Sequence, residues 1–230
     1  RRWRVADAGA RAGAEAHAGA GAVQERTGAK WGEVWRFASS WEAARVAGAE
    51  AVSVGISHVA VVDSDGAVWT WGCGQYGALG VGGWENESRP VRVQALPTRT
   101  VAVTAGAFFT AAVGADGGVY TWGEGRFLGH GSEEPELVPR RVQGLPRVVA
   151  VSAGDGHCVA VGEDGRVWSW GEGWRGRLGL GDEEDRLRPT LVESLSAHTI
   201  VAASAGGAHT AFLTSEGALY TCGDGDLGRL

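Results

Sequence analysis

The fold of this chain is decided by residues 164–195, which read DGRVWSWGEGWRGRLGLGDEEDRLRPTLVESL. The pentapeptide VWSWG inside this stretch, residues 167–171, has counterparts at residues 68–72 (VWTWG), 119–123 (VYTWG) and 219–223 (LYTCG). At intervals of 51, 48 and 52 residues come the closing glycines Gly72, Gly123, Gly171 and Gly223. Self-similarity at a period of about fifty residues predicts a repeat architecture.

Three further markers keep the same register. The same intervals of 51, 48 and 52 residues separate a second set of glycines, Gly55, Gly106, Gly154 and Gly206. Three positions after these glycines stand His58, Phe109, His157 and His209, so one unit departs from the histidine pattern. Three units also share a proline, at Pro90, Pro139 and Pro189. Independent markers in one register indicate that the repeat is genuine.

Each unit is expected to contain four short strands. In the first unit, residues 58–62 and 67–71 flank an Asp/Gly turn, which is typical of a β-hairpin. A glycine-rich loop follows, and the strand after it, residues 90–96, begins with a proline, which suits a strand start. We expect the run Val101 to Ala105 to complete the unit as its fourth strand.

Four-stranded units repeated in series predict an all-β protein, a β-propeller of four-stranded blades. Tryptophans two positions apart share one face of a strand, so neighbouring blades can enclose them. We therefore interpret the recurrent tryptophans Trp71, Trp122 and Trp170 as packing residues. The recurrent glycines and histidines listed above are also interpreted as structural, with each histidine bonding a backbone group inside its own blade.

Residues 46–230 resemble the regulator-of-chromosome-condensation repeat family in these strands, in the Gly-x-Leu-Gly loop and in the proline-led strand. The resemblance implies a seven-bladed ring, of which this chain would hold an arc of about four blades, truncated at both ends. Full repeats are expected at 66–116, 117–164 and 165–216, and partial ones at 46–65 and 217–230. Residues 1–45 are interpreted as an Ala/Gly-rich lead-in, either of low complexity or a degenerate first blade.

Charge and composition exclude several classes of partner. The formal net charge is −6; residues 1–50 carry 8 basic and 6 acidic side chains, and residues 51–230 carry 13 basic and 21 acidic ones. An acidic body does not favour direct nucleic-acid binding, which needs clustered Lys and Arg. No apolar run is long enough to predict a membrane span. Three widely spaced cysteines and no visible signal peptide favour an intracellular protein, cytoplasmic or nuclear.

The motifs that resemble catalytic or cofactor sites have simpler explanations. Gly-x-Gly-x-x-Gly follows three of the strands, but no helix follows to hold a dinucleotide pyrophosphate. The histidines recur once per repeat and are too dispersed for a shared metal ion. His157 and Cys158 are neighbours on one strand, so they point to opposite faces and form a poor dyad. We predict no enzymatic activity, no cofactor and no metal.

The loops that follow the pentapeptides are the candidate interaction sites, because rigid scaffolds bind partners through their loops. Trp and Arg are enriched among the residues that dominate protein interfaces. One loop contains Trp84, Glu85, Asn86 and Glu87, and another contains Trp174, Arg175, Asp182, Glu183, Glu184 and Asp185.

We expect a protein-interaction scaffold whose loops bind a protein partner. The resemblance implies one alternative, a guanine-nucleotide exchange factor for a Ran-like small GTPase, although the wedge-forming insertion of that family member has no counterpart in these short loops. A second alternative is a Trp-based ultraviolet photoreceptor, as in a plant member of the family. Trp174 lies in a different loop from the Gly-Trp-Arg-His-Thr motif of that member.

Overall fold

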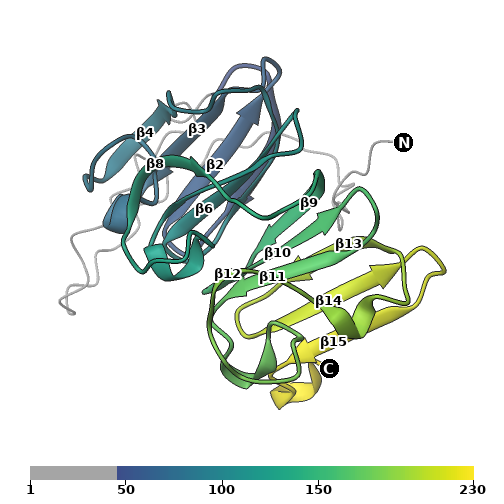
Figure 1. The fold of residues 1–230 in the computed structure, drawn as a ribbon. Coiled ribbons are helices and arrows are strands. Elements are labelled where there is room, and N and C mark those ends of the chain that lie inside the picture. The colour runs from purple at the N-terminus through teal and green to yellow at the C-terminus, as the bar shows by residue number, and fades with distance from the viewer. Residues whose placement is uncertain (1–45) are drawn as a thin grey trace, which may run out of the picture. The chain divides into compact units, whose positions relative to one another are not determined.

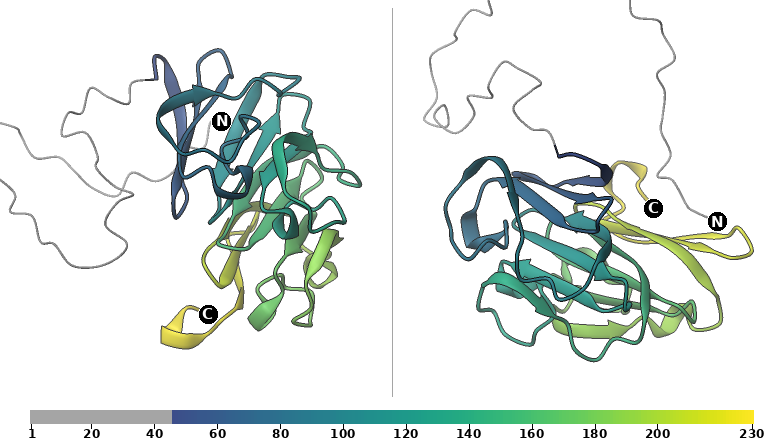
Figure 2. Two further views of the ribbon diagram at one scale, coloured as in Figure 1. Left: turned by 90° about the vertical axis from the view of Figure 1, so that its left-hand side faces the viewer. Right: turned by 90° about the horizontal axis from the view of Figure 1, so that it is seen from above.

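The computed structural model describes residues 46–230, so the expectations for residues 1–45 lie outside the described part. Fifteen strands form four antiparallel sheets, which Figure 1 shows in chain order from purple to yellow and Figure 2 shows from two other directions. The first blade contains β1 (Ala49–Val54), β2 (His58–Asp63), β3 (Val68–Gly72) and β4 (Glu87–Arg92). The second contains β5 (Thr100–Ala105), β6 (Phe109–Gly114), β7 (Val119–Gly123) and β8 (Glu136–Arg141).

The third blade contains β9 (Val148–Ala153), β10 (His157–Gly162), β11 (Val167–Gly171) and β12 (Arg186–Leu191). The fourth sheet has three described strands, β13 (Ile200–Ala205), β14 (His209–Thr214) and β15 (Leu219–Gly223). Single 3-10 turns, η1 to η5, occupy Gln75–Gly77, Gly125–Phe127, Trp174–Gly176, Glu193–Leu195 and Asp226–Gly228. Each blade is a meander in which consecutive strands pair.

The structure corrects one strand assignment. The run Val101 to Ala105 was expected to complete the first unit, but it belongs to β5, which pairs with β6 in the second blade. The segment 93–99 crosses from β4 of one blade to β5 of the next, whereas only residues 106–108 separate β5 from β6. A short antiparallel connection favours pairing with the following strand. Each sequence repeat therefore contributes to two blades.

Hydrophobic side chains fill each of the three junctions between consecutive blades. Trp122 on β7 packs with Val62, Val68 and Val93 of the first blade. Trp170 on β11 packs with Leu128 and other side chains of the second blade, and its indole Nε1 donates to the backbone oxygen of Phe127 at 3.0 Å. At the equivalent position of the fourth blade stands Cys222, which packs at the third junction. Trp71, in the first blade, is half-buried.

The second glycine marker is explained by the approach of neighbouring backbones. A Cβ atom added to Gly55 would lie 2.1 Å from the backbone oxygen of Gly106, and one added to Gly154 would lie 2.2 Å from that of Gly206. Such distances are far inside van der Waals contact. Only glycine allows the loops at these positions to stack from blade to blade. The pentapeptide glycines have a different reason, because Gly72, like its three counterparts, has φ above +100°.

Polar bonds between the first strands of the blades follow the same rhythm. The hydroxyl of Ser53 accepts a hydrogen bond from the amide of Ala105 at 3.0 Å. Two equivalent bonds of the same length join the amides of Ala153 and Ala205 to the hydroxyls of Thr104 and Ser152. These side-chain acceptors satisfy amides that have no strand partner on that side.

The recurrent histidines do not bond a backbone group inside their own blade, as the sequence had suggested. The imidazole of His58 reaches the hydroxyl of Thr110 in the second blade, with Nε2 and Oγ1 2.7 Å apart. That hydroxyl donates its single hydrogen to the carbonyl of Ala78 at 2.8 Å. His58 must therefore donate from Nε2. His157 and Thr210 form the same bond at the third junction, at 2.8 Å.

The middle junction replaces this bond by an apolar pair. Phe109 stands where the other blades have histidine, and Cys158 stands where Thr110 and Thr210 accept the bond. Both side chains are fully buried in the same hydrophobic cluster. The histidine and its acceptor are thus replaced together, which leaves no unsatisfied hydroxyl at this junction.

This arrangement predicts a pH dependence of stability. Burial lowers the pKa of His58 to about 4 and the pKa of His157 to about 3, with the Arg177 charge adding to the effect on His157. In the unfolded chain these residues titrate near 6.5, so below that pH the unfolded state binds more protons. The contribution of these histidines to the free energy of unfolding is therefore highest above pH 6.5. As the pH drops toward the pKa values of the folded state, each histidine lowers this free energy by at most roughly 1.4 kcal/mol for every pH unit.

The test compares urea denaturation of the natural chain with that of His157→Phe/Thr210→Cys, which copies the middle junction. We expect the double variant to lose less stability between pH 6.5 and pH 5. Equal losses in the two proteins would contradict the assignment of this pH dependence to His157.

Candidate interaction face

Two kinds of loop lie at the same end of the blades. His58, the first residue of β2, pairs with Gly72, the last residue of β3, so the loops before His58 and after Gly72 share one end of the first sheet. The other blades repeat this register. We call this end the loop face; it comprises residues 55–57, 73–86, 106–108, 124–135, 154–156, 172–185, 206–208 and 224–230.

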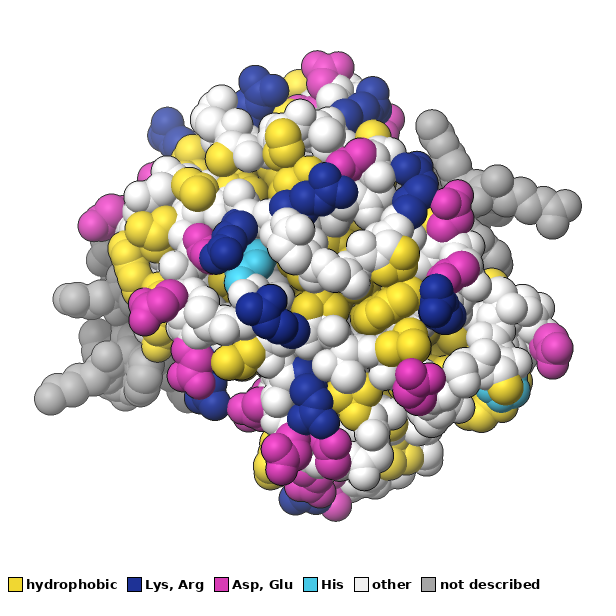
Figure 3. Space-filling model, in the orientation of Figure 1, with side chains coloured by type: hydrophobic (Ala, Val, Ile, Leu, Met, Phe, Trp, Pro, Cys, Tyr) yellow, Lys and Arg dark blue, Asp and Glu magenta, His cyan; other side chains and the backbone are white. Residues whose placement is uncertain are grey.

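The negative charge of the repeat region is concentrated on the loop face. Its residues include twelve Asp or Glu and four Arg, whereas the remainder of residues 51–230 contains nine of each. Figure 3, in the orientation of Figure 1, shows basic side chains interspersed with acidic and hydrophobic ones on the visible side. The loop face therefore attracts cationic groups, and the rest of residues 51–230 has no net charge.

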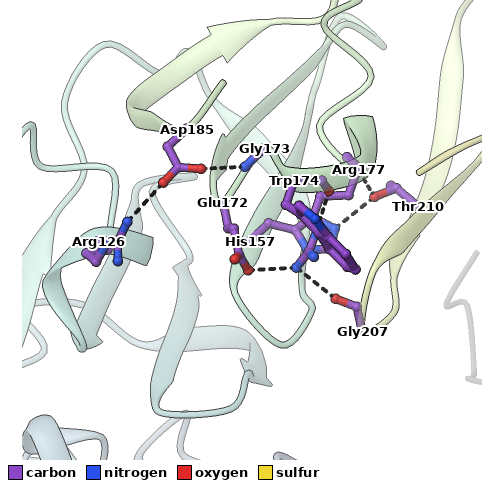
Figure 4. A network of polar contacts seen from close by, with 9 residues as sticks. All are labelled: Arg126, His157, Glu172, Gly173, Trp174, Arg177, Asp185, Gly207 and Thr210. Atoms are coloured by element: carbon purple, nitrogen blue, oxygen red, sulfur yellow. Dashed lines mark hydrogen bonds and ion pairs between the residues drawn. The ribbon is translucent and has the colours of Figure 1, made fainter. Parts of the chain in front are cut away.

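On the third blade, Trp174 lies beside two arginines of its own loop, of which Figure 4 shows Arg177. Trp174 is the first residue of η3 and is 48% exposed. The guanidinium carbon of Arg175 lies 4.8 Å from the centre of the indole ring and that of Arg177 lies 5.2 Å from it. Cation–π contacts of this kind hold the indole in place.

Arg177 is buried, with 4% of its side chain exposed, and its side chain fixes the loop and joins it to the fourth blade. Its Nε donates to the backbone oxygen of Trp174 at 3.0 Å. Its Nη1 donates to Glu172 Oε2 at 2.9 Å and to the backbone oxygen of Gly207, in the fourth blade, at 3.1 Å. A buried charge needs such partners, so Arg177 is a structural residue that supports Trp174.

Arg175 reaches the fourth blade, where its Nη1 lies 3.3 Å from Asp224 Oδ1 and 3.4 Å from Asp226 Oδ2. Arg175 adopts a left-handed backbone conformation with φ of 62°. Hydrogen bonds from Asp226 and the charges of Arg175 and Arg229 lower the pKa of Asp224, despite the opposing effect of burial. The third and fourth blades are therefore joined at the loop face by a small ionic cluster.

The acidic run of the third blade is partly satisfied within the chain. Asp182 accepts from the amide of Glu184 at 3.0 Å and pairs with Arg186 at 2.6 Å. Asp185 accepts from the amide of Gly173 at 2.9 Å and pairs with Arg126 of the second blade at 3.1 Å (Figure 4). Glu183 and Glu184 are exposed, and their side chains form no ion pair with another of the described residues.

Three aromatic side chains meet at the loop face of the first two blades. Trp84 is 48% exposed, and its ring centre lies 5.8 Å from that of Tyr76. Tyr76 in turn lies 5.7 Å from Phe108 of the second blade, in an edge-on arrangement. We call Tyr76, Trp84 and Phe108 the aromatic surface. Tyr76 has a φ of 57°, the same unusual conformation as Arg175.

The remaining candidate residues of this loop surround Trp84. Asn86 accepts from the amide of Gly74 at 2.9 Å, so its side chain fixes the loop as Asp185 does in the third blade. Glu87 begins β4 and pairs with Gly72, and Glu85 is exposed. The side chains of Asn86 and Asp185 therefore stabilise the loop backbones. Trp84 and Glu85, in contrast, face solvent.

Residue spacing did not point to Tyr76, Phe108 or Arg177 as residues of the loop face. Tyr76 and Arg177 lie two and four residues after the first glycine of the loop, at positions that look variable between repeats. Phe108 belongs to the short loop before β6, which does not follow one of the pentapeptides. One signal was available: Phe108 is adjacent to Phe109, the residue that departs from the histidine pattern.

The described residues offer little reactive chemistry. Burial raises the pKa of the Cys158 thiol far above its usual range and raises that of Cys222 to about 11, so neither forms a thiolate readily. Within residues 46–230, no group of three or more His, Cys, Asp or Glu side chains could hold a metal ion. The same part of the chain contains no helix long and apolar enough to cross a membrane.

Comparison with known protein families matches residues 65–113, 116–161 and 164–213 to the Regulator of chromosome condensation (RCC1) repeat. A second description of the same repeat matches residues 50–78, 148–176 and 200–229. The first set of segments covers more than half of the chain, and each of its segments spans the connection between two of the blades described above.

Curated proteins with similar sequences include the ultraviolet-B receptor UVR8 of Arabidopsis thaliana, 40% identical over 184 residues, and the human E3 ubiquitin-protein ligase HERC2, 37% identical over 178 residues. These alignments cover 78% and 74% of this chain, but only 42% and 4% of the relatives. Among solved structures, human WBSCR16 matches with a TM-score of 0.70 and 25% identity, over 78% of this chain and 48% of that one. The predicted family resemblance and the predicted all-β propeller are confirmed.

Proposed function

Because the chain belongs to the Regulator of chromosome condensation (RCC1) repeat family, we propose that it is a non-catalytic, intracellular protein-interaction module whose partner binds the loop face. One observation carries the proposal: the excess negative charge and two half-exposed tryptophans, Trp84 and Trp174, lie on the same end of the blades. Exposed aromatic side chains with charged neighbours are typical of the residues that dominate binding energy.

The rigidity of the scaffold supports the proposal. Asn86, Asp185 and Arg177 fix the loop backbones through hydrogen bonds, so little conformational freedom remains to be lost when a partner binds. The opposite end carries the short turns between the second and third strands of each blade. These turns carry five carboxylates and one arginine, Arg166, which pairs with Asp164 at 2.7 Å, and they contain no aromatic side chain.

A site-specific cross-linking experiment tests the proposed function. A photoreactive benzoylphenylalanine is introduced in place of Glu85 on the loop face or in place of Gln94 at the opposite end, and the full chain is irradiated in cells. We expect a partner that cross-links from Glu85 and not from Gln94, and that binds the natural chain after purification. Cross-linking from Gln94 alone would contradict the proposal. Faster release of labelled nucleotide from Ran in the presence of the chain would instead support the exchange-factor alternative.

A second candidate function is light sensing, which rests on Trp174. Its indole lies against two guanidinium groups, and the similar plant protein is an ultraviolet-B receptor. If the chain senses ultraviolet light through Trp174, irradiation changes its elution volume in size-exclusion chromatography, and Trp174→Phe abolishes the change. An elution volume that is unchanged by irradiation would exclude this function.

A further inference from the structure

We propose that the aromatic surface of Tyr76, Trp84 and Phe108 accepts a lysine or arginine side chain from a basic segment of the partner. This inference rests on the proposed function, because it names the chemistry of the partner that the loop face binds. Its residues come from two blades: Tyr76 and Trp84 from the loop after β3, and Phe108 from the loop between β5 and β6.

The geometry of the aromatic surface leaves one ring open. Tyr76 is held between the other two rings, at 5.8 Å from Trp84 and 5.7 Å from Phe108, and is half-buried. Trp84 is at the outer side of this row, with about half of its surface exposed. An indole ring that is fixed from one side and open on the other is a ready platform for a cation.

The third blade shows how a cation is accommodated on the same loop. Trp174 has guanidinium groups 4.8 and 5.2 Å from its ring centre, both from its own loop. Among the described residues, the cation–π contacts involve Trp168 and Trp174 and not Trp84. Of the two half-exposed loop tryptophans, Trp174 therefore already contacts two guanidinium groups, whereas Trp84 contacts no cation among the described residues.

Alignment of the two loops explains the difference. Counted from Gly74 and Gly173, Tyr76 occupies the position of Arg175, and Trp84 occupies the position of Glu183. Where the third blade has an arginine and a glutamate, the first blade has two aromatic rings. The first loop thus has the aromatic partner of a cation–π contact and lacks the cation.

Charge complementarity decides which ligand fits. The loop face contains twelve carboxylates against four arginines, and Glu85 lies next to Trp84 in the sequence. Glu124 is tied to the aromatic surface, because its amide donates to the backbone oxygen of Phe108 at 3.0 Å. Burial raises the pKa of Glu124, the charge of Arg126 opposes this shift, and the carboxylate of Glu172 adds to it. The excess negative charge of the loop face attracts a cation, whereas a nucleic acid or an acidic peptide would be repelled.

The experiment titrates the full chain into fluorescein-labelled peptides and follows their anisotropy at low and physiological salt. The probes are a peptide of alternating glycine and arginine, its lysine counterpart and its glutamate counterpart. We expect both basic peptides to bind, with weaker binding at higher salt, and the glutamate peptide not to bind. Trp84→Ala should weaken binding of the arginine peptide about 5-fold, and Trp84→Phe should weaken it less.

Tyr220→Ala is the matched control, because it removes an aromatic side chain that is exposed but lies outside the loop face. It should change the affinity for the arginine peptide less than about 2-fold. Equal affinities of the natural chain and Trp84→Ala, or equal binding of the glutamate peptide, would overturn the proposal. A cross-linked loop-face partner whose affinity is unchanged by Trp84→Ala would also overturn it while leaving the proposed function intact. If the cross-linking experiment found no partner at the loop face, both the proposed function and the proposed cation site at Trp84 would be contradicted.

Discussion

Gly154→Ala is expected to cost about 3 kcal/mol or more of unfolding free energy. The added methyl group would lie 2.2 Å from the backbone oxygen of Gly206 and 2.5 Å from the imidazole of His157. Neither neighbour is the free end of a flexible chain, so the third and fourth blades must separate to admit it. Overpacking of rigid sites costs 1–3 kcal/mol and occasionally more. Urea denaturation followed by circular dichroism measures the loss.

Gly83→Ala is the control for this substitution. The nearest atom to its added methyl group is 4.0 Å away, and Gly83 has no positive φ that would strain a larger residue. The free energy of unfolding should change by less than about 0.5 kcal/mol. If Gly154→Ala and Gly83→Ala had the same unfolding midpoint, the close stacking of the blade loops would be wrong.

The second large effect is expected for Trp170→Ala, at about 3–5 kcal/mol of unfolding free energy. The indole is fully buried between the second and third blades, where it packs beside Gly129 and Leu128. Its removal creates a cavity and also leaves the backbone oxygen of Phe127 without its donor. The same denaturation measurement applies, with tyrosine and backbone signals in place of tryptophan fluorescence.

Trp84→Ala serves as the comparison for Trp170→Ala, because it removes the same side chain from an exposed position. Its cost should be about half that of Trp170→Ala, on the order of 2 kcal/mol, since roughly half of the indole is already in water. Should Trp84→Ala destabilise the chain as much as Trp170→Ala, the cohesion of the blades could not be attributed to the indoles between them.

Much of the fold could be predicted because the repeat carries its own register. Pentapeptides ending in Trp-Gly define the third strand of each blade, and an Asp/Gly turn defines the hairpin before it. Periodicity alone does not show whether Val101 to Ala105 pairs with the preceding or the following hairpin, since either choice repeats every fifty residues. The length of the connecting segments decides it, and the run belongs to the following blade.

The histidines illustrate a second limit. Their recurrence indicated a structural role, but their partners lie about fifty residues ahead, in the next blade, and are hydroxyls rather than backbone groups. The paired replacement of His and Thr by Phe109 and Cys158 was visible in the sequence. It could be interpreted only once the structure showed that these two positions meet.

The sequence indicated which types of residue lie in the candidate loops, but it did not show which neighbouring side chains surround each of them. Trp84 and Trp174 looked alike in the sequence and are equally exposed, yet only Trp174 is covered by arginines of its own loop. The acidic run looked uniformly free, but Asp182 and Asp185 are used within the chain. Side-chain partners contributed by neighbouring blades, such as Phe108 beside Tyr76, depend on tertiary packing that residue spacing does not reveal.

The central claim, that Trp84 is the open platform of the loop face, is tested most directly by nuclear magnetic resonance. Each tryptophan contributes one indole N–H signal, and Trp84→Phe and Trp174→Phe assign the two of interest. On titration of the full chain with the arginine peptide, we predict a progressive shift of the Trp84 signal while the Trp174 signal stays in place. A shift confined to Trp174, or no shift of either signal at saturating peptide, would contradict the account.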